Sequence, residues 1–190
     1  MSKVVTLEAV RWLENARNGD AEAFSRLVQV HYARVWRFLI KWVKNRDDAE
    51  ELAQETFLAA WRNLAGFRAD AQFSTWLLGI ALNLARNHHN RSPARRWEVE
   101  LDESAHLEIP ATRSSDPLVQ WEQKSSLQAL QAAIERLPAD MREAIVLIRL
   151  EGLSLEQAAG ILGVPVGTVK SRLSRAKDKL RSELGDYLHE

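Results

Sequence analysis

The feature that most constrains the fold is a helical spacing of apolar residues through the first ninety positions, where glycine and proline are sparse. Between residues 24 and 40, apolar side chains recur every three or four positions, which places them on one face of an α-helix. A second such segment runs through residues 49–64 and opens with Asp47 and Asp48, whose carboxylates suit a helix N-terminus. A third follows Ser74. This pattern predicts an all-α N-terminal domain.

The helical spacing fails between residues 92 and 117. That segment contains Pro93, Pro110 and Pro117, several acidic residues and a Thr-Arg-Ser-Ser stretch, which is the composition of a flexible linker. Helical spacing returns at Leu118. We therefore predict an all-α chain of two helical domains, residues 1–91 and 118–190, joined by a flexible linker over residues 92–117.

Composition limits the classes of function. A hydrophobic content of 46% is enough for a globular protein, and the absence of cysteine excludes disulfides, thiol catalysis and cysteine-ligated metals in this chain. The formal net charge is zero, so any DNA-binding surface must be a local basic patch. The longest apolar run, around Trp76 to Ala85, is too short to span a bilayer, so we expect a cytoplasmic protein without membrane insertion.

The C-terminal domain carries the sharpest local pattern. Ser154 followed by Gln157 fits a capping box and predicts a short helix over residues 155–162, and Gly163 supplies a turn that often needs a left-handed backbone. A second helix begins near Pro165 and buries Val166, Val169, Leu173, Ala176 and Leu180 at alternating spacings of three and four. Together these segments predict a C-terminal helix-turn-helix.

With Val169 facing inward, the second helix turns cations and hydroxyl groups outward. Such groups can bond to base edges and phosphates in a major groove. A basic helix end that only complements the helix dipole is the competing interpretation, and the adjoining turn pattern favours DNA binding. The candidate DNA-contacting residues are Thr168, Lys170, Ser171, Arg172, Ser174, Arg175 and Lys177.

Three stretches of the chain carry a family resemblance. Residues 48–62 read DAEELAQETF and then Trp61-Arg62. This stretch looks like the polymerase-binding helix of the extracytoplasmic-function (ECF) group of RNA polymerase sigma factors, in the sigma-70 family. Residues 67–85 resemble the adjoining promoter-melting segment, and residues 137–176 resemble the second DNA-binding region. The stretches follow the family order on both sides of the predicted linker.

The resemblance assigns polymerase docking to the helix that begins near Asp47. On that helix an outward stripe mixes acidic groups with an apolar residue, which suits a basic partner surface. An ordinary solvated acidic face is the alternative for the same stripe. The candidate polymerase-binding residues are Asp48, Glu51, Leu52, Gln54, Glu55 and Leu58.

Promoter melting requires the capture of unpaired bases by aromatic stacking, a pocket and nearby cations. The resemblance implies that a loop over residues 66–72 holds a flipped base. For Trp76 a place in the core is an equal alternative, and Trp36, Trp42 and Trp61 are expected in the core. Leu82 and Asn87 depart from the family pattern, which leaves the base preference open. The candidate residues for the downstream promoter element are Phe67, Phe73, Trp76, Asn83, Arg86 and Arg91.

The resemblance implies a sigma factor that binds core RNA polymerase and promoter DNA, with no catalytic residues, cofactor or metal of its own. It reads the upstream element with the helix-turn-helix and melts the downstream element with the N-terminal domain. Members of the family are commonly inhibited by an anti-sigma factor, so an anti-sigma partner, including a membrane-tethered one, is expected.

Two other functions compete with the sigma factor. A stand-alone dimeric helix-turn-helix regulator would bind a palindromic site without polymerase. A helical metalloenzyme would use His31, His88 and His89, but adjacent histidines on a helix point about 100 degrees apart and no His-Glu-x-x-His string supports them.

Overall fold

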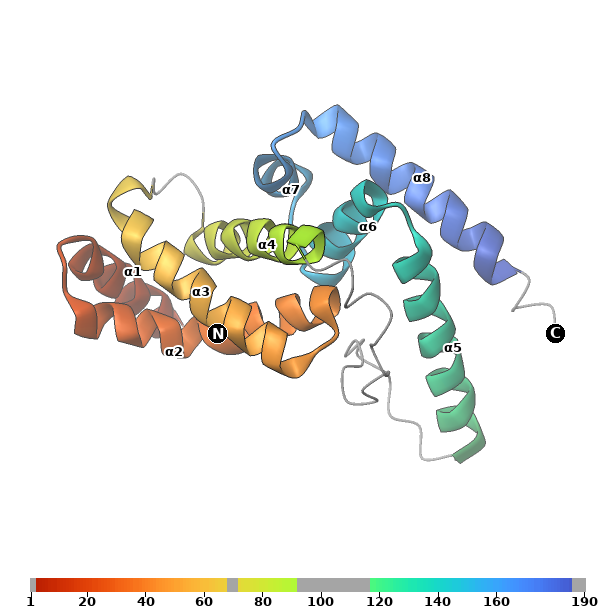
Figure 1. Cartoon of the computed structure of the whole chain (residues 1–190), viewed down its shortest axis with the longest axis horizontal. Coiled ribbons are helices and arrows are strands. Elements are labelled where there is room, and N and C mark those ends of the chain that lie inside the picture. The colour runs from red at the N-terminus through yellow and green to blue at the C-terminus, as the bar shows by residue number, and fades with distance from the viewer. Residues whose placement is uncertain (1–2, 68–71, 92–116, 186–190) are drawn as a thin grey trace. The chain divides into compact units, whose positions relative to one another are not determined.

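The described helices of the chain fall into two units, Met1–His106 and Leu107–Glu190. The computed structural model describes residues 3–67, 72–91 and 117–185 of the 190-residue chain (Figure 1). Within these ranges all regular structure is helical, which confirms the predicted all-α fold. The predicted linker up to residue 116 and residues 68–71 of the predicted base-capturing loop lie outside the described ranges.

The described part of the N-terminal unit contains four helices and one short 3-10 turn. They are α1 (Lys3–Arg17), α2 (Ala21–Val43), α3 (Arg46–Asn63), η1 (Leu64–Gly66) and α4 (Phe73–Arg91). Asp20 caps α2 by accepting hydrogen bonds from the backbone of Glu22 and Ala23 at 2.9 and 3.0 Å. Asn45 caps α3 in the same way, and Asp47 and Asp48 occupy its first turn as predicted.

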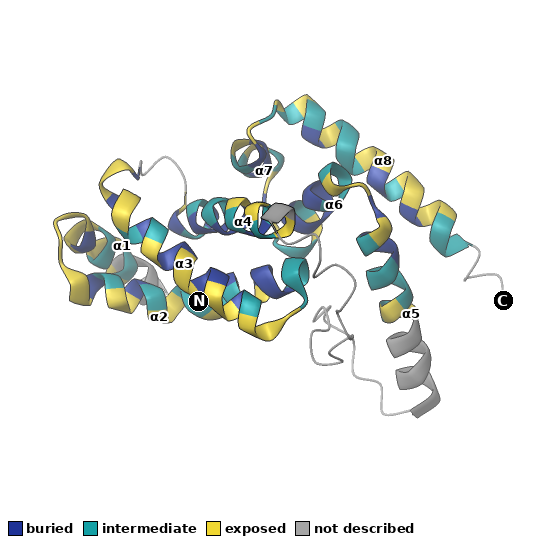
Figure 2. Cartoon of the chain, viewed as in Figure 1, coloured by how far each residue is buried: buried dark blue, intermediate teal, exposed yellow. Residues whose placement is uncertain are grey.

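The core of the N-terminal unit lies along α2. This helix packs against α1, α3 and α4, and α3 also packs against α4. Figure 2 shows the buried residues as stripes on facing sides of these helices. Among the most fully buried side chains of the described residues are Leu27, Val35, Phe38, Leu39, Leu77, Leu78 and Leu82.

The C-terminal unit contains α5 (Pro117–Arg136), α6 (Ala139–Ile145), a π-helical turn η3 (Val146–Leu150), α7 (Leu155–Leu162) and α8 (Val166–Gly185). Helix α8 packs against α5, α6 and α7. Pro138 is the N-cap residue of α6. The core cluster comprises Ala133, Ile134, Leu137, Ile145, Ala176 and Leu180.

The helix-turn-helix forms at the predicted residues. Ser154 and Gln157 make both hydrogen bonds of the capping box, at 2.9 and 3.2 Å. Gly163 ends α7 with φ of 67°, a left-handed conformation that glycine adopts without steric cost. The inward face of α8 differs in one respect from the prediction: Val166 and Leu173 are only partly buried, and Leu173 packs against the edge of the core cluster.

Candidate nucleic-acid and partner interfaces

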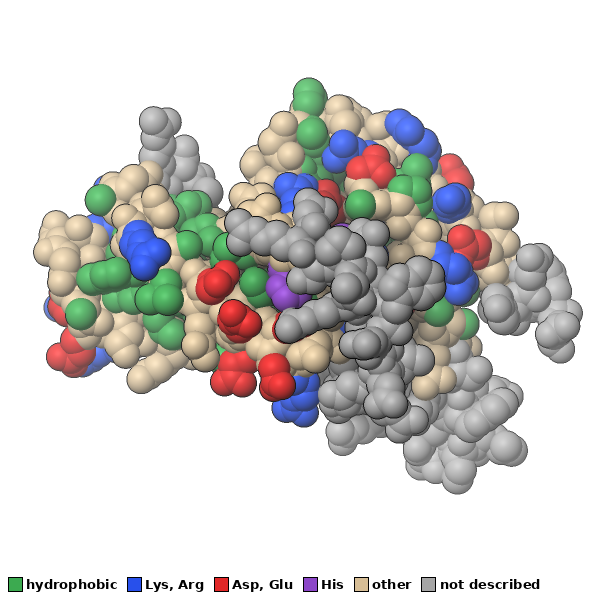
Figure 3. Space-filling view, viewed as in Figure 1, with side chains coloured by type: hydrophobic (Ala, Val, Ile, Leu, Met, Phe, Trp, Pro, Cys, Tyr) green, Lys and Arg blue, Asp and Glu red, His purple; other side chains and the backbone are tan. Residues whose placement is uncertain are grey.

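Helix α3 presents the predicted outward stripe. Glu51, Gln54, Glu55 and Leu58 are all exposed, because positions three and four apart share one side of a helix. We call these four residues the acidic stripe. Leu58 is 56% exposed, the highest value among the exposed large hydrophobic residues in the part of the chain that the structure describes. Figure 3 shows acidic side chains gathered over the N-terminal half of α3 and hydrophobic ones beside its C-terminal half.

Two residues predicted for polymerase binding lie elsewhere. Leu52 is 4% exposed, so its side chain belongs to the core and is not part of the stripe. The periodicity that turns Glu51 and Glu55 outward necessarily turns Leu52 inward. Asp48 is partly buried, and its Oδ2 lies 3.3 Å from Nε2 of His88 on α4. Asp48 therefore contributes to the contact between α3 and α4.

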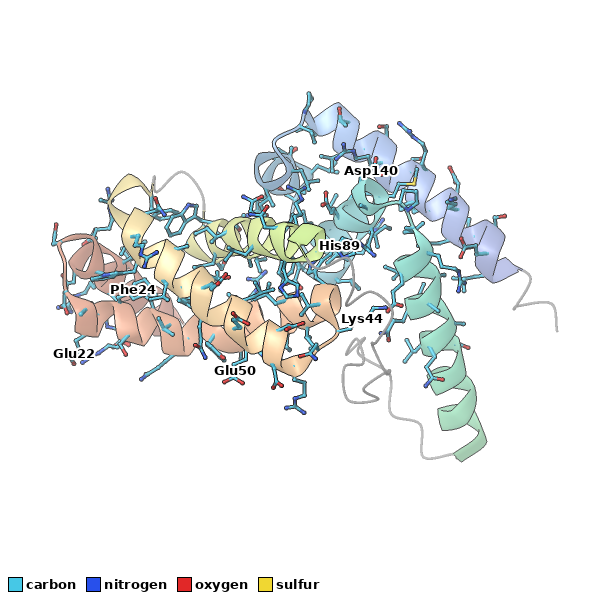
Figure 4. All side chains as sticks on the ribbon, in the orientation of Figure 1. Glu22, Phe24, Lys44, Glu50, His89 and Asp140 are labelled. Carbon is cyan, nitrogen blue, oxygen red and sulfur yellow. The ribbon has the colours of Figure 1, made fainter. Side chains whose placement is uncertain are left out.

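A pair of aromatic rings continues the acidic stripe, and its surface position is not evident from the sequence. Phe24 of α2 contacts Trp61 of α3 with ring centroids 4.9 Å apart. Both residues are only partly buried, although Trp61 was expected in the core. Trp61 follows Leu58 by three positions and so lies beside it on α3. Figure 4 shows Phe24 on α2 next to the C-terminal half of α3. We call Phe24, Leu58 and Trp61 the apolar patch.

The aromatic residues predicted to capture bases form one cluster at the start of α4. Ring centroids are 5.7 Å apart for Phe67 and Phe73, 5.0 Å for Phe67 and Trp76, and 5.7 Å for Phe73 and Trp76. Phe67 is 3% exposed and Phe73 is 9% exposed, whereas Trp76 is partly exposed. The first two side chains therefore fill the core on either side of residues 68–71, and only Trp76 offers a surface.

His31 closes this cluster from α2. Its ring meets Phe73 edge-on, with centroids 5.4 Å apart. Burial lowers the pKa of His31, and the positive charge of Arg34 adds to the effect. A neutral imidazole is therefore favoured against the aromatic ring.

Asn83 lies on the exposed side of α4, as the prediction requires. It follows Trp76 by seven positions, which is about two helical turns, so the two residues share a face. Its Oδ1 accepts a hydrogen bond from Nη1 of Arg86 at 3.3 Å. Arg91 is the last residue of α4, and its side chain lies outside what the structure describes.

Helix α8 presents an exposed polar face over its first three turns. Lys170, Ser174 and Arg175 are exposed, while Thr168 and Ser171 are partly buried. The Ser171 hydroxyl donates to the Thr168 carbonyl at 2.9 Å and lies 3.4 Å from Nη2 of Arg175. Arg175 is therefore held over the face by a hydroxyl group, which leaves its charge uncompensated by a carboxylate at that contact.

Two other cations of α8 lie near acidic groups. Nε of Arg172 is 3.4 Å from Oδ2 of Asp140 in the first turn of α6. Glu156 has a lowered pKa, mainly because its own backbone N–H and the Ser154 hydroxyl stabilise the carboxylate, with a smaller effect from the charge of Lys170. Lys177, further along the helix, is partly buried. The predicted DNA-contacting residues thus differ in what surrounds their charges.

The comparisons with known proteins agree on one family. The model for Sigma-70 region 2 matches residues 27–95, and the model for Sigma-70 region 4 matches residues 127–180. The RNA polymerase sigma-H factor of Pseudomonas aeruginosa is 32% identical and is covered over 94% of both chains. The ECF RNA polymerase sigma-E factor of Haemophilus influenzae is 33% identical, over 97% of this chain and 98% of the relative.

Solved structures give the same result. CnrH, in complex with the cytosolic domain of CnrY, aligns with a TM-score of 0.68 and 26% identity over 94% of this chain and 98% of that chain. The sigma factor RpoE of Bartonella quintana, in complex with the anti-sigma factor NepR, aligns with a TM-score of 0.62 and 31% identity over 87% of this chain and 98% of that chain.

The chain therefore belongs to the ECF group of RNA polymerase sigma factors. This confirms the predicted function, a factor that directs promoter-specific initiation of transcription. The stand-alone regulator gains no support, because the N-terminal unit matches sigma region 2. In the described residues no group of three or more metal-ligating side chains occurs. No described helix has the length and apolar character needed to cross a membrane.

Proposed function

We propose that the acidic stripe and the apolar patch of the N-terminal unit form the docking surface for core RNA polymerase. The observation that carries this is Leu58, a large apolar side chain that is 56% exposed among acidic neighbours. Exposed apolar groups beside charges are typical of protein interfaces, where the apolar part supplies affinity and the charges steer association. Phe24 and Trp61 extend the apolar part without adding a charge.

We propose a division of roles at the downstream promoter element. Trp76 and Asn83 share the exposed face of α4, which suits stacking on and hydrogen bonding to unpaired bases. Arg86 and Arg91 follow them toward the end of the helix and suit contacts with phosphates. Phe67 and Phe73 are buried in the core, so their contribution to melting is indirect.

At the upstream element, Arg175 is the residue best suited to read a base. It is exposed, and arginine can bond to two acceptors of a guanine at once. Thr168, Ser171 and Ser174 offer hydroxyl groups, and Lys170 offers a charge to the backbone phosphates. Lys177 adds a sequence-independent attraction.

Catalysis in this scheme belongs to the polymerase, and the sigma factor acts where the polymerase is, in the cytoplasm. Two structural relatives form complexes with CnrY and with the anti-sigma factor NepR. We infer that this chain has an anti-sigma partner that competes for the acidic stripe and the apolar patch, since an inhibitor there blocks docking directly.

Run-off transcription tests the proposal. Sigma-free core polymerase is incubated with a library of promoters from the source genome, with and without the full chain. Transcripts from a defined subset of promoters are expected only when the chain is present. Binding of the chain alone to duplex operators, without such transcripts, would contradict the proposal.

A further inference from the structure

The ion pair between Arg172 and Asp140 separates Arg172 from the other cations of α8. The Arg172 side chain is 22% exposed and that of Asp140 is 45% exposed, with 3.4 Å between Nε and Oδ2. Lys170 and Arg175 on the same helix are exposed. Arg172 thus forms an ion pair with a carboxylate of another helix, whereas Lys170 has only a weaker electrostatic interaction with Glu156 of α7.

Helical geometry explains why Arg172 reaches α6. At about 100 degrees per residue, with the buried Val169 facing inward, Arg172 lies about 60 degrees from the inward direction and Arg175 about 120 degrees, on the same side. Arg172 therefore occupies the boundary between the core and the exposed face. Arg172 precedes Arg175 by three positions, about one helical turn, and lies on the same side of α8 but closer to the core.

The Asp140 end of the pair is anchored in a rigid turn. Pro138 precedes α6, and its carbonyl accepts hydrogen bonds from the backbone of Met141 at 3.0 Å and of Arg142 at 2.9 Å. Proline has a fixed φ, and a carboxylate in the first turn of a helix is stabilised by the helix dipole. Figure 4 shows Asp140 at the start of α6 beside α8.

We propose that Asp140 and Arg172 form a brace that sets the rotation of α8 about its axis, and hence the base position that Arg175 reaches. Arg172 is in this view a positioning residue and not a reader of DNA. The inference rests on the proposed role of α8 at the upstream element and adds a determinant of specificity that lies on α6, away from the helix-turn-helix itself.

The two roles of Arg172 predict opposite effects of the same substitution. If the pair is a brace, Asp140→Asn loosens α8 and weakens promoter recognition. If Arg172 contacts DNA and Asp140 merely competes for it, Asp140→Asn frees the arginine, removes a negative charge near the phosphates and strengthens recognition.

The experiment compares holoenzymes made with the full chain on a promoter whose upstream element is varied one base at a time. Arg175→Ala first identifies the base position that Arg175 reads. Asp140→Asn and Arg172→Ala are each expected to reduce discrimination at that same position, about two- to fivefold, as the strength of a partly exposed ion pair allows. The double variant is expected to lose no more than the larger single loss, because both changes break one contact.

A matched control lies at the other end of α8. Nε of Arg136 is 3.1 Å from Oε2 of Glu183, so Glu183→Gln also removes one acid and one ion pair from this unit. It is expected to leave the base profile unchanged. The brace is overturned if Asp140→Asn leaves the profile unchanged or increases activity, if Arg172→Ala affects a different base from Arg175→Ala, or if Glu183→Gln gives the same change.

The design separates two failures. If the unaltered chain supports no promoter-specific transcription, the proposed function itself fails. If the unaltered chain initiates normally and Arg175→Ala alters one base position while Asp140→Asn does not, only the brace fails.

Discussion

The two units present their functional faces in different ways. In the N-terminal unit, the proposed docking surface lies on one side of α3 and includes Phe24 of α2. The opposite side of α3, with Leu52 and Phe57, is buried in a core of long helices. In the C-terminal unit, a short capped helix and a glycine turn precede α8, and Nε of Arg172 on α8 lies 3.4 Å from Oδ2 of Asp140 on α6. In the first arrangement the buried side of α3 depends on the packing of long helices, whereas the second combines local capping motifs with an ion pair between distant residues.

This difference has a consequence for how each unit responds to substitution. Aromatic residues near the promoter-melting segment contribute mainly to stability in the N-terminal unit, because Phe67 and Phe73 are buried. In the C-terminal unit, the exposed cations of α8 can be changed with little effect on the core. Substitutions in the two units can therefore test the comparison directly.

The largest expected effect is on stability. Phe73→Ala should lower the free energy of unfolding by about 3 to 5 kcal/mol, because it empties an aromatic site between Phe67, Trp76 and His31. Asn83→Ala, on the exposed side of the same helix, should change stability by less than about 0.5 kcal/mol. Urea denaturation of the full chain measures both. A stable Phe73→Ala variant that fails only in promoter opening would restore Phe73 as a base contact.

The next effect is on specificity. Arg175→Ala should cost about 1 to 3 kcal/mol at one base position of the upstream element, whereas Lys177→Ala should weaken binding to all sequences about equally. The reason is that a bidentate arginine reads a base edge and a lysine contacts the backbone. Transcription from the single-base promoter set distinguishes them. Equal losses for the two variants would argue against the assigned face of α8.

A third effect is on docking. Leu58→Asp should weaken the affinity for core polymerase by about 1 to 2 kcal/mol, since it places a charge in the apolar patch without touching the core. Val10→Asp is the matched control, because Val10 is 50% exposed on α1, away from α3 in sequence. Fluorescence titration of labelled core polymerase measures both affinities. The docking surface is misplaced if the two variants lose affinity equally.

A smaller effect concerns the local motif of the C-terminal unit. Ser154→Ala should reduce stability by about 1 kcal/mol, because it removes the acceptor for the Gln157 backbone N–H at 3.2 Å. Ser174→Ala, at an exposed helical position, should have almost no effect. Thermal unfolding followed by circular dichroism compares them. Equal melting temperatures for the two variants would show that the cap contributes little.

The smallest effect is a pH dependence confined to the N-terminal unit. Because burial lowers the pKa of His31 below its ordinary value of 6.5, the unfolded state binds a proton more readily than the folded state. The folded state therefore has its full stability with respect to His31 above pH 6.5, where the imidazole is neutral in both states. Part of that stability is lost as the pH falls from 6.5 through the lowered pKa of His31. His31→Gln should therefore show a smaller drop in unfolding free energy between about pH 8 and about pH 5.5. An unchanged drop would mean that other groups cause it.

The sequence predicted the C-terminal features well because each depends on neighbours in the chain. A capping box needs only Ser154 and Gln157, and a left-handed turn needs only Gly163. The outward stripe of α3 was predicted for the same reason, since helical periodicity alone orients Glu51 and Leu58. The family resemblance was based on short sequence motifs that occur in the family order. It was confirmed by matches over nearly the whole chain.

The sequence did not determine which aromatic side chains are buried. The sequence does not distinguish the burial of Phe67, Phe73 and Trp76. The packing of α2 against the start of α4 buries the two phenylalanines and leaves Trp76 at the surface. The surface position of Phe24 beside Trp61 depends on the contact between α2 and α3 in the same way.

What the sequence alone determined is therefore the helical segments, the capping box at Ser154, the helix-turn-helix and the family. What only the tertiary structure decided is the partner of each polar or aromatic side chain, as in the pairs Asp48 with His88 and Asp140 with Arg172. The physical reason is the separation in sequence over which each interaction acts. Helix periodicity and capping act within about four residues, whereas burial and ion pairing depend on which distant segments meet.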